Sequence, residues 1–306
     1  MATSVFLIVI GLIGLALGGE LLVRGAVGIA KAMGLSSLLT GVIIVGMATS
    51  MPELVTSVEA ARAGSPEIAW GNIVGSNISN TLLILGATAL VAPIVLTGLG
   101  RRDAAVALGA SGLLVGLALW QVGALWIGAA LLVLLTVYIV WRLNHPRVAD
   151  SDEEDLSIPN LPVAIPLFIV GLGALVLGGG WLVEGAIDIA TVAGVSETVI
   201  GLTVVAVGTS LPELAASVAA AFRGKPGLAI GNVVGSNIYN ILLIGGATML
   251  MAPLALPTEI QGVQSIILLA SAAAMWALLW AGKTIGRVMG GILLLAFTGY
   301  VVITLL

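Results

Sequence analysis

The chain has no cysteine and very little charge, and both absences narrow what it can be. Without cysteine, disulfides, thiolate metal sites and cysteine nucleophiles are excluded. Only 8% of the 306 residues are charged, whereas a soluble domain carries about 25%, so this sequence cannot supply a water-facing surface. Histidine occurs once, as His145 in a polar stretch beside Pro146 and Arg147, which argues against a zinc site.

Apolar residues dominate instead, at 59% of the chain, with a mean hydropathy of +1.21. The apolar runs, of roughly 18–25 residues, match the length of a helix that crosses a bilayer, and lipid does not tolerate open sheet edges. We therefore expect an all-α integral membrane protein with ten transmembrane helices. The expected spans lie near residues 5–31, 38–61, 68–92, 103–119, 122–141, 163–190, 197–221, 228–252, 261–281 and 285–305.

Lysine and arginine fall almost entirely on one side of these spans, and only Arg62 lies on the other. Because cytoplasmic loops carry the excess of positive residues, we expect a multi-pass protein of the plasma membrane with both termini outside and the 143–161 loop in the cytoplasm. The positive residues on the cytoplasmic side are Arg24, Lys31, Arg101, Arg102, Arg142, Arg147, Arg223, Lys225, Lys283 and Arg287.

The second half of the chain repeats the first with a constant offset of 160 residues, so that Gly18-Gly19 matches Gly178-Gly179. Each half holds five spans, an odd number, so the halves should insert with opposite orientation. Inverted repeats with a site at their interface are typical of secondary transporters. We expect a first five-helix repeat at 1–142, an acidic cytoplasmic loop at 143–161 and a second five-helix repeat at 162–306. The acidic run within that loop lacks the pattern of a calcium-binding EF-hand loop, so we expect it to be solvated.

Each half also carries two polar motifs inside its apolar spans. The sequence GMATSMPE at 46–53 is matched by AVGTSLPE at 206–213, and GNIVGSNISN at 71–80 is matched by GNVVGSNIYN at 231–240. Residues three and four apart share a helix face, so the Thr-Ser pair of each first motif should lie beside its glutamate. Proline donates no backbone hydrogen bond, so we expect carbonyls near Gly46 and Ala206 to be left without a partner.

Together these motifs place carboxylate, hydroxyl, amide and carbonyl oxygens inside the membrane. Hard oxygen donors suit Ca²⁺ and Na⁺, and they disfavour transition metals that prefer His or Cys. The candidate ligands are Glu53, Glu213, Thr49, Ser50, Thr209, Ser210, Ser76, Ser236, Asn80, Asn240, Gly46 and Ala206.

A structural role competes with this interpretation for the neutral residues, because Ser, Thr and Asn also join transmembrane helices by hydrogen bonds. Both interpretations stay open for Asn72, Asn77, Asn232 and Asn237. The glutamates are different, because a carboxylate in the membrane interior costs at least about 2.5 kcal/mol and the motifs contain no lysine or arginine. A bound cation is the natural partner. We expect Glu20, Arg24, Glu184 and Asp188, toward span ends, to pair or reach the membrane surface.

At these motifs the sequence resembles the cation/Ca²⁺ exchanger superfamily, specifically its prokaryotic Na⁺/Ca²⁺ exchanger branch. The family pattern G-T-S-x-P-E followed by G-N-x-x-G-S-N-x-x-N occurs twice, in order, and the resemblance covers nearly the whole chain. Two departures are Ala48, where the family usually has Gly, and Asn240, where some relatives carry Asp. Because that Asp is similar to the pattern of K⁺-dependent exchangers, Asn240 argues against K⁺ co-transport.

The resemblance implies an exchanger that expels Ca²⁺ using the Na⁺ gradient, in which the first and sixth helices slide past a fixed core. It implies that Glu53 and Glu213 are the central Ca²⁺ ligands, and that Asn80 and Asn240 line that site. The flanking Na⁺ sites would use Thr49, Ser50, Thr209, Ser210, Ser76 and Ser236, with the carbonyls of Gly46 and Ala206 completing the cluster.

We therefore expect a secondary antiporter, not an enzyme, that exchanges Na⁺ for Ca²⁺ electrogenically by alternating access. Its partners would be these two ions and the lipid bilayer, with no cofactor, nucleic acid or obligate protein partner. H⁺/Ca²⁺ exchange is the main alternative, although protons would not need the hydroxyls beside each glutamate. A passive channel would lack coupled counter-flux. A membrane hydrolase with Glu53 and Glu213 as acid and base would lack His or Cys and leave the repeat unexplained.

Overall fold

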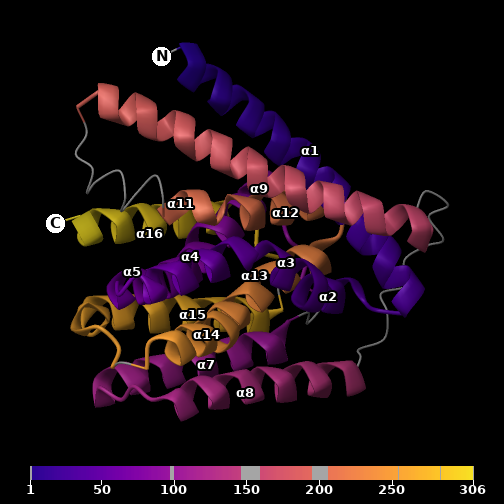
Figure 1. Ribbon diagram of the computed structural model, residues 1–306. Helices are drawn as coiled ribbons and strands as arrows, with labels where there is room; N and C mark the ends of the chain where they lie inside the picture. The colour runs from indigo at the N-terminus through magenta and orange to yellow at the C-terminus, as the bar shows by residue number, and fades with distance from the viewer. Residues whose placement is uncertain are drawn as a thin grey trace.

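A computed structural model describes residues 2–96, 100–145, 159–194, 206–253, 255–282 and 284–305 of the chain. Within these residues the fold is helical, and the only strand-like pairing is an antiparallel bridge between Ile94 and Ile285. In chain order the elements are α1 (Ala2–Met33), α2 (Ser37–Thr40), η1 (Gly41–Val45), α3 (Gly46–Thr49), α4 (Met51–Arg62), α5 (Pro66–Ser79), η2 (Asn80–Ile84), α6 (Leu85–Val91), α7 (Arg101–Trp120), α8 (Leu125–Asn144), α9 (Leu161–Val192), α11 (Ala206–Thr209), α12 (Leu211–Phe222), α13 (Pro226–Tyr239), η4 (Asn240–Ile244), α14 (Gly245–Met251), η5 (Thr258–Ile260), α15 (Val263–Ala281) and α16 (Arg287–Leu305) (Figure 1).

Among the described residues, eight helices are long and apolar enough to cross a membrane. A ninth span results if the bent pair Ser37–Thr49 and Met51–Arg62, which breaks by 42°, is taken as one. These nine coincide with nine of the ten expected spans. The remaining expected span, 197–221, begins outside the described residues, and its described part consists of α11 and the short apolar helix α12. The all-helical membrane class is confirmed.

The 160-residue repeat of the sequence is also a repeat of local structure. The series α5, η2 and α6 recurs residue for residue as α13, η4 and α14. The π-helical turns η2 and η4 begin at Asn80 and Asn240, two of the candidate ligands, and such turns are frequent at functional sites. In both halves a serine with nearly the same backbone angles, Ser50 or Ser210, interrupts the helix just before a proline.

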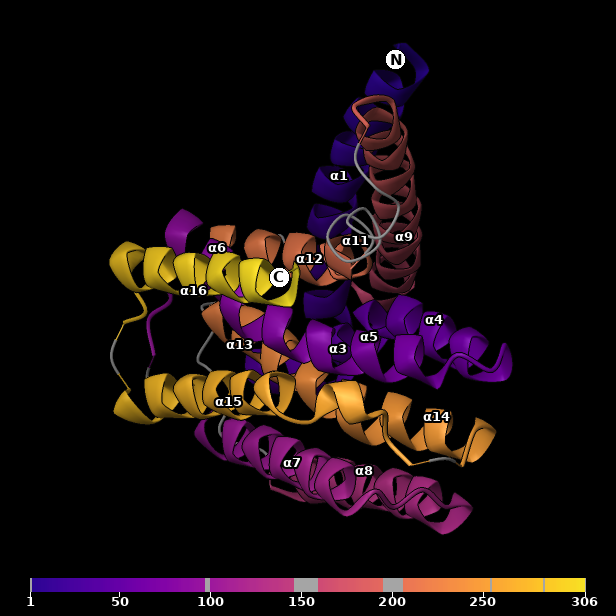
Figure 2. The ribbon, with the colours of Figure 1, turned by 90° about the vertical axis from the view of Figure 1, so that its left-hand side faces the viewer.

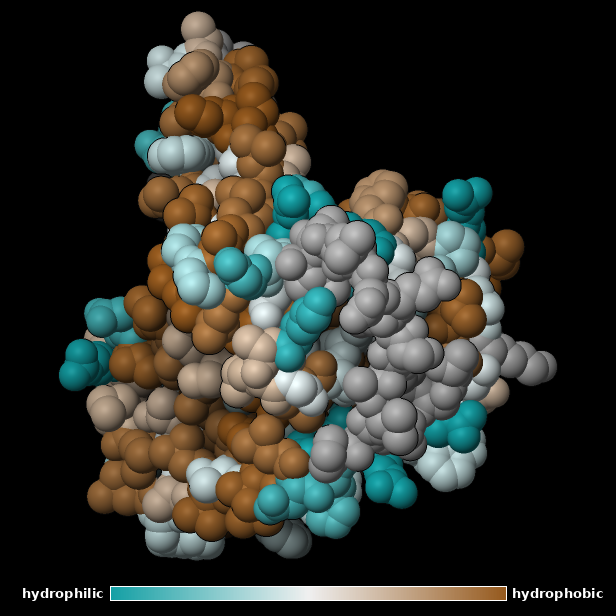
Figure 3. Space-filling model, turned by 90° about the vertical axis from the view of Figure 1, so that its right-hand side faces the viewer, coloured by the Kyte–Doolittle hydropathy of each residue, from teal (hydrophilic) through white to brown (hydrophobic). Residues whose placement is uncertain are grey.

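Helices α1 and α9 form an arm that projects from the other helices, which we call the body (Figure 2). The two helices run antiparallel, since Gly11 of α1 faces Gly178 of α9 whereas Gly25 faces Phe168. Glycine at these positions lets the backbones approach closely, as is common between membrane helices. Hydrophobic side chains cover much of the arm and part of the body (Figure 3), and Phe6 and Leu17 are more than half exposed. Such a surface suits lipid.

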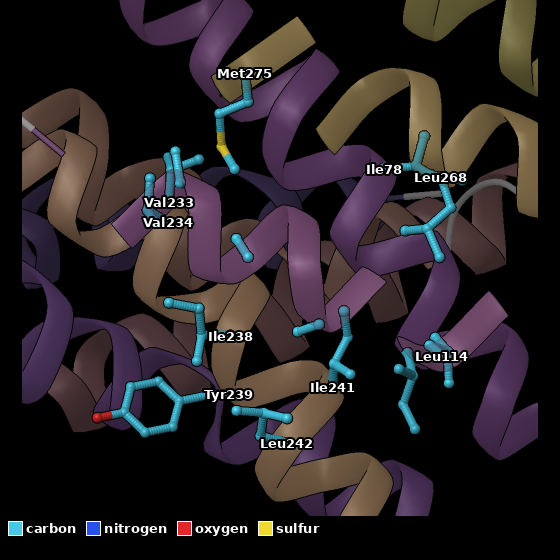
Figure 4. Packing of buried hydrophobic residues seen from close by; sticks show 14 of the residues in the cluster. Ile78, Leu114, Val233, Val234, Ile238, Tyr239, Ile241, Leu242, Leu268 and Met275 are labelled. Carbon is cyan, nitrogen blue, oxygen red and sulfur yellow. The ribbon is translucent and has the colours of Figure 1, made fainter. Parts of the chain in front are cut away.

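Helix α13 is the most enclosed element of the body, because every residue from Gly227 to Tyr239 is buried. A Cβ atom at Gly231 would lie 2.8 Å from the Cα atom of Gly41, so this glycine is what allows α13 to touch η1. The hydrophobic cluster around α13 includes Val233, Val234, Ile238, Tyr239, Ile241, Leu242, Leu114, Leu268 and Met275 (Figure 4).

A buried ion pair joins α7 to α8. The Arg142 Nε atom lies 2.6 Å from Asp103 Oδ1, and the Tyr138 hydroxyl donates to the same oxygen at 2.8 Å. The expected span of 122–141 leaves Arg142 outside the membrane helix, and that boundary is wrong, because α8 continues to Asn144 and Arg142 is only 4% exposed. Losing one partner of a buried ion pair leaves an uncompensated charge, so this pair holds the two helices in register.

The tight contact at Gly231 generates a prediction with a matched control in the other half of the chain. Gly231→Ala should destabilise the protein by about 1–3 kcal/mol, because the new methyl group overpacks the contact with η1. Gly71 occupies the equivalent position, and a Cβ atom there would meet nothing within 4 Å. Thermal unfolding in detergent should therefore show a lower melting temperature for Gly231→Ala and no decrease for Gly71→Ala. Equal decreases would contradict the proposed packing.

Candidate cation-binding site

Glu53 and Glu213 hold equivalent places, each in the first turn of a helix that follows a break. Both are buried, with 2% and 1% of their surface exposed. Pro52 and Pro212 stand just before them, at a helix position where the absent N–H group costs nothing. The proline thus allows a helix to begin inside the protein, and the first turn aims a carboxylate into the interior.

Side chains of the first motif form hydrogen bonds with Glu213 and with a neighbouring residue of the second half. The Ser50 hydroxyl donates to Glu213 Oε1 at 3.3 Å, and the Thr49 hydroxyl donates to Asn232 Oδ1 at 3.1 Å. Residues some 160 positions apart in the sequence therefore form one polar cluster.

An asparagine supports the start of each glutamate helix. The Asn72 amide donates to the backbone carbonyl of Glu53 at 3.3 Å and to the Ser57 hydroxyl at 2.9 Å. The second half repeats both bonds, at 3.1 and 2.9 Å, with Asn232, Glu213 and Ser217. These bonds favour a structural role for Asn72 and Asn232. Ser57 and Ser217 were not predicted from the sequence, although each lies four residues after its glutamate on the same helix face.

Five of the candidate ligands have a buried oxygen with no hydrogen-bond partner within the part of the chain that the structure describes, namely Glu53 Oε2, Glu213 Oε2, Asn80 Oδ1, Asn240 Oδ1 and Ser210 Oγ. The same holds for oxygens of Asn77, Thr88, Asn237, Tyr239 and Thr248. A buried polar group left unpaired costs about 1–3 kcal/mol, so the unpaired oxygens of the two glutamates and of the three neutral ligands require an explanation. Hard oxygen donors of this kind are what Ca²⁺ and Na⁺ bind. A cation at this position would satisfy them.

The remaining candidate ligands lie in the same motifs. Ser76 and Ser236 are buried, Thr209 is half-buried and has an interaction partner, and Ala206 begins α11. The expectation of an unpartnered carbonyl at Gly46 is wrong. This oxygen accepts the Ser50 N–H at 3.2 Å and the Ser236 hydroxyl at 3.5 Å, because the helix continues to Thr49 before it breaks.

The other intramembrane charges lie apart from this cluster. Glu20 pairs with Arg223, and Asp188 accepts a hydrogen bond from the Ser4 hydroxyl at 3.3 Å. The acidic run at 150–155 lies outside the described residues. Across the described ranges, no three His, Asp or Glu residues come together as a metal site would require. The negative charge of the candidate site therefore comes from Glu53 and Glu213, and its other oxygens are neutral.

Comparisons with known proteins agree with this geometry. The family model described as sodium/calcium exchanger protein matches residues 3–144 and 163–306. The protein CaxA of Alkalimonas amylolytica is 36% identical over 98% of each chain, and the sodium/calcium exchanger MaX1 of Methanosarcina acetivorans is 31% identical over 99% of each chain. Among solved structures, the sodium-calcium exchanger NCX_Mj superposes with a TM-score of 0.84 at 32% identity, over 97% of each chain.

These matches confirm the family that the paired motifs predict, and the relatives are transporters, not enzymes. The chain belongs to the sodium/calcium exchanger protein family and is a secondary antiporter of the membrane.

Proposed function

We propose that this antiporter exchanges Na⁺ for Ca²⁺ across the plasma membrane through one site that both motifs form. The observation that carries the proposal is that both glutamates and three of the neutral candidate ligands each have a buried oxygen without a partner in the described part of the chain. No lysine or arginine occurs in the motifs to neutralise the carboxylates. Both motifs come from one chain, so the site needs no partner protein.

In this proposal Ca²⁺ lies between Glu53 and Glu213, with the amide oxygens of Asn80 and Asn240 as further ligands. The flexible, many-oxygen coordination that Ca²⁺ takes matches such a mixed set. Na⁺ would use the neutral oxygens that flank the glutamates. These are the hydroxyls of Thr49, Ser50, Thr209, Ser210, Ser76 and Ser236 and the carbonyl of Ala206, whereas the Gly46 carbonyl already accepts two hydrogen bonds.

Exchange becomes obligatory in this proposal because the two carboxylates carry a charge of about −2. An unneutralised carboxylate in a water-excluded site is strongly disfavoured. One Ca²⁺ neutralises the pair, and so do Na⁺ ions at the flanking oxygens, whereas the empty site remains charged. The loaded protein can then change the side to which its site opens, and the empty protein cannot. More than two Na⁺ per Ca²⁺ would make the cycle electrogenic.

We further propose a topology of ten transmembrane helices in two inverted repeats, at 1–142 and 162–306. The antiparallel packing of α1 and α9, which occupy equivalent positions in the two halves, supports the inversion. Arg142 does not add to the positive charge of the cytoplasmic surface, because it is buried and paired with Asp103. The remaining nine still oppose the single Arg62. We therefore propose that both termini lie outside and that the 143–161 loop lies in the cytoplasm.

The central role of the carboxylates predicts the effect of neutralising them. In proteoliposomes, Glu53→Gln or Glu213→Gln should reduce Na⁺-driven uptake of radioactive Ca²⁺ to the level of empty vesicles, because the site loses half of its charge. Glu59 lies on the same helix as Glu53 but is exposed, so Glu59→Gln should retain uptake. Near-normal exchange in either site variant would contradict the proposed site.

The choice of driving ion is tested separately. Two buried carboxylates could also bind protons, so H⁺/Ca²⁺ exchange is the alternative. We expect Ca²⁺ uptake under an imposed Na⁺ gradient and background uptake under a pH gradient or a K⁺ gradient alone, since the hydroxyls beside each glutamate serve Na⁺ and not protons. If a pH gradient drives uptake to the same extent as a Na⁺ gradient, the H⁺/Ca²⁺ alternative is favoured. Uptake without any counter-ion gradient would indicate a channel.

A further inference from the structure

A bidentate ion pair at the edge of the arm lies outside the proposed cation site. It joins Glu20 of α1 to Arg223, the residue that ends α12. The Arg223 Nε atom donates to Glu20 Oε2 at 2.6 Å, and Nη2 contacts the other carboxylate oxygen. Two parallel contacts of this kind fix the relative geometry of their partners. The side chains are 40% and 35% exposed, so solvent and salt can reach the pair.

Small residues bring α1 and α12 into close contact. A Cβ atom on Gly19 would lie 2.9 Å from the Ala215 carbonyl and 3.3 Å from the Ala219 side chain. Small residues allow close approach but interlock little, so they set no strong register between the two helices. The Glu20–Arg223 pair supplies the directional contact in this interface.

The arm covers the second half of the chain but not the equivalent face of the first half. Gly179 of α9 also packs on the second motif, against Leu211 and Pro212. In the first half, Ala215 and Ala219 correspond to Val55 and Glu59 of α4 at the 160-residue offset. Val55 is 61% exposed and Glu59 is exposed. Among the described residues, the arm thus docks on one of two related faces and leaves Val55 and Glu59 of the other exposed.

In transporters built from inverted repeats, access alternates when one bundle rocks against the other around a fixed site. If the halves exchange roles, the arm leaves α12 and α9 docks on α4, with Gly179 beside Val55. The positions equivalent to Glu20 and Arg223 are Gly180 and Ala63. The second arrangement therefore has no counterpart of the ion pair.

We propose that the Glu20–Arg223 pair is a latch that holds the arm on α12 and biases the transporter toward the side to which this conformation opens. The two repeats would otherwise give two similar states, and the latch makes their populations unequal. Exposed ion pairs bias an equilibrium by about two- to fivefold. This inference rests on the proposed alternation between the inverted repeats.

The absence of native cysteine allows a direct test by disulfide cross-linking. Gly179→Cys and Val55→Cys together should cross-link under mild oxidant only when α9 docks on α4. Gly179 has room for the new side chain, since its nearest neighbours would lie 3.8–3.9 Å from a Cβ atom. Adding Glu20→Gln or Arg223→Gln should raise the cross-linking rate about two- to fivefold. Arg24→Gln, which removes an exposed charge one turn along α1, should leave the rate unchanged.

Two further measurements separate a latch from general loosening of the fold. The exchanged pair, Glu20→Arg with Arg223→Glu, should restore the slow rate. High salt should accelerate cross-linking with the native pair present but not in Glu20→Gln, because it screens exposed charges. Unchanged rates in both single variants, an equal effect of Arg24→Gln, or no cross-link in any variant would overturn the latch. Because cross-linking needs no ion gradient, a failure of Na⁺-driven Ca²⁺ uptake would overturn the proposed function without altering this result.

Discussion

Two carboxylates buried inside a membrane protein, with no positive side chain in their motifs, set the main constraint on this structure. Glu53 and Glu213 are almost fully enclosed, and in such surroundings a charge is tolerated only if something neutralises it. The helix breaks at Ser50 and Ser210 bring the carboxylates into the interior. The asparagine bonds from the neighbouring helices fix the first turns that carry them. In the proposed function a cation neutralises the remaining charge, and this neutralisation links the fold to transport.

The repeat explains how one site arises from two copies of a short motif. Each copy supplies one glutamate, one Thr-Ser pair and one π-helical turn that begins with asparagine. The two copies of the motif are in contact. Helix α13 packs on η1 through Gly231, and Ser50 of the first copy is within hydrogen-bonding distance of Glu213 of the second. Where the copies differ, the fold gains features that symmetry alone would not provide. The contact between Glu20 and Arg223, which the second copy cannot make, is one such feature.

The sequence predicted the features that depend on composition or on short spacing. The low charge and long apolar runs indicated membrane helices, and the motif spacing predicts that the glutamates and the neutral oxygens around them bind cations. It could not predict contacts that depend on how helices pack. The pairs Asp103–Arg142 and Glu20–Arg223 join residues far apart in the chain, and no local pattern marks them. The Gly46 carbonyl was wrongly expected to be free because the helix continues to Thr49 and the Ser50 N–H bonds to it, and a second partner, Ser236, comes from the other half.

The most direct test of the account is a crystal structure of the protein soaked with Ca²⁺, with the ion located by anomalous scattering. The account predicts one strong peak between the two half-chain motifs, with carboxylate oxygens of both Glu53 and Glu213 at about 2.3–2.6 Å. Soaking with Na⁺ in excess should remove this peak. A Ca²⁺ ion bound elsewhere, or held by only one of the two glutamates, would contradict the claim that both motifs form a single exchange site.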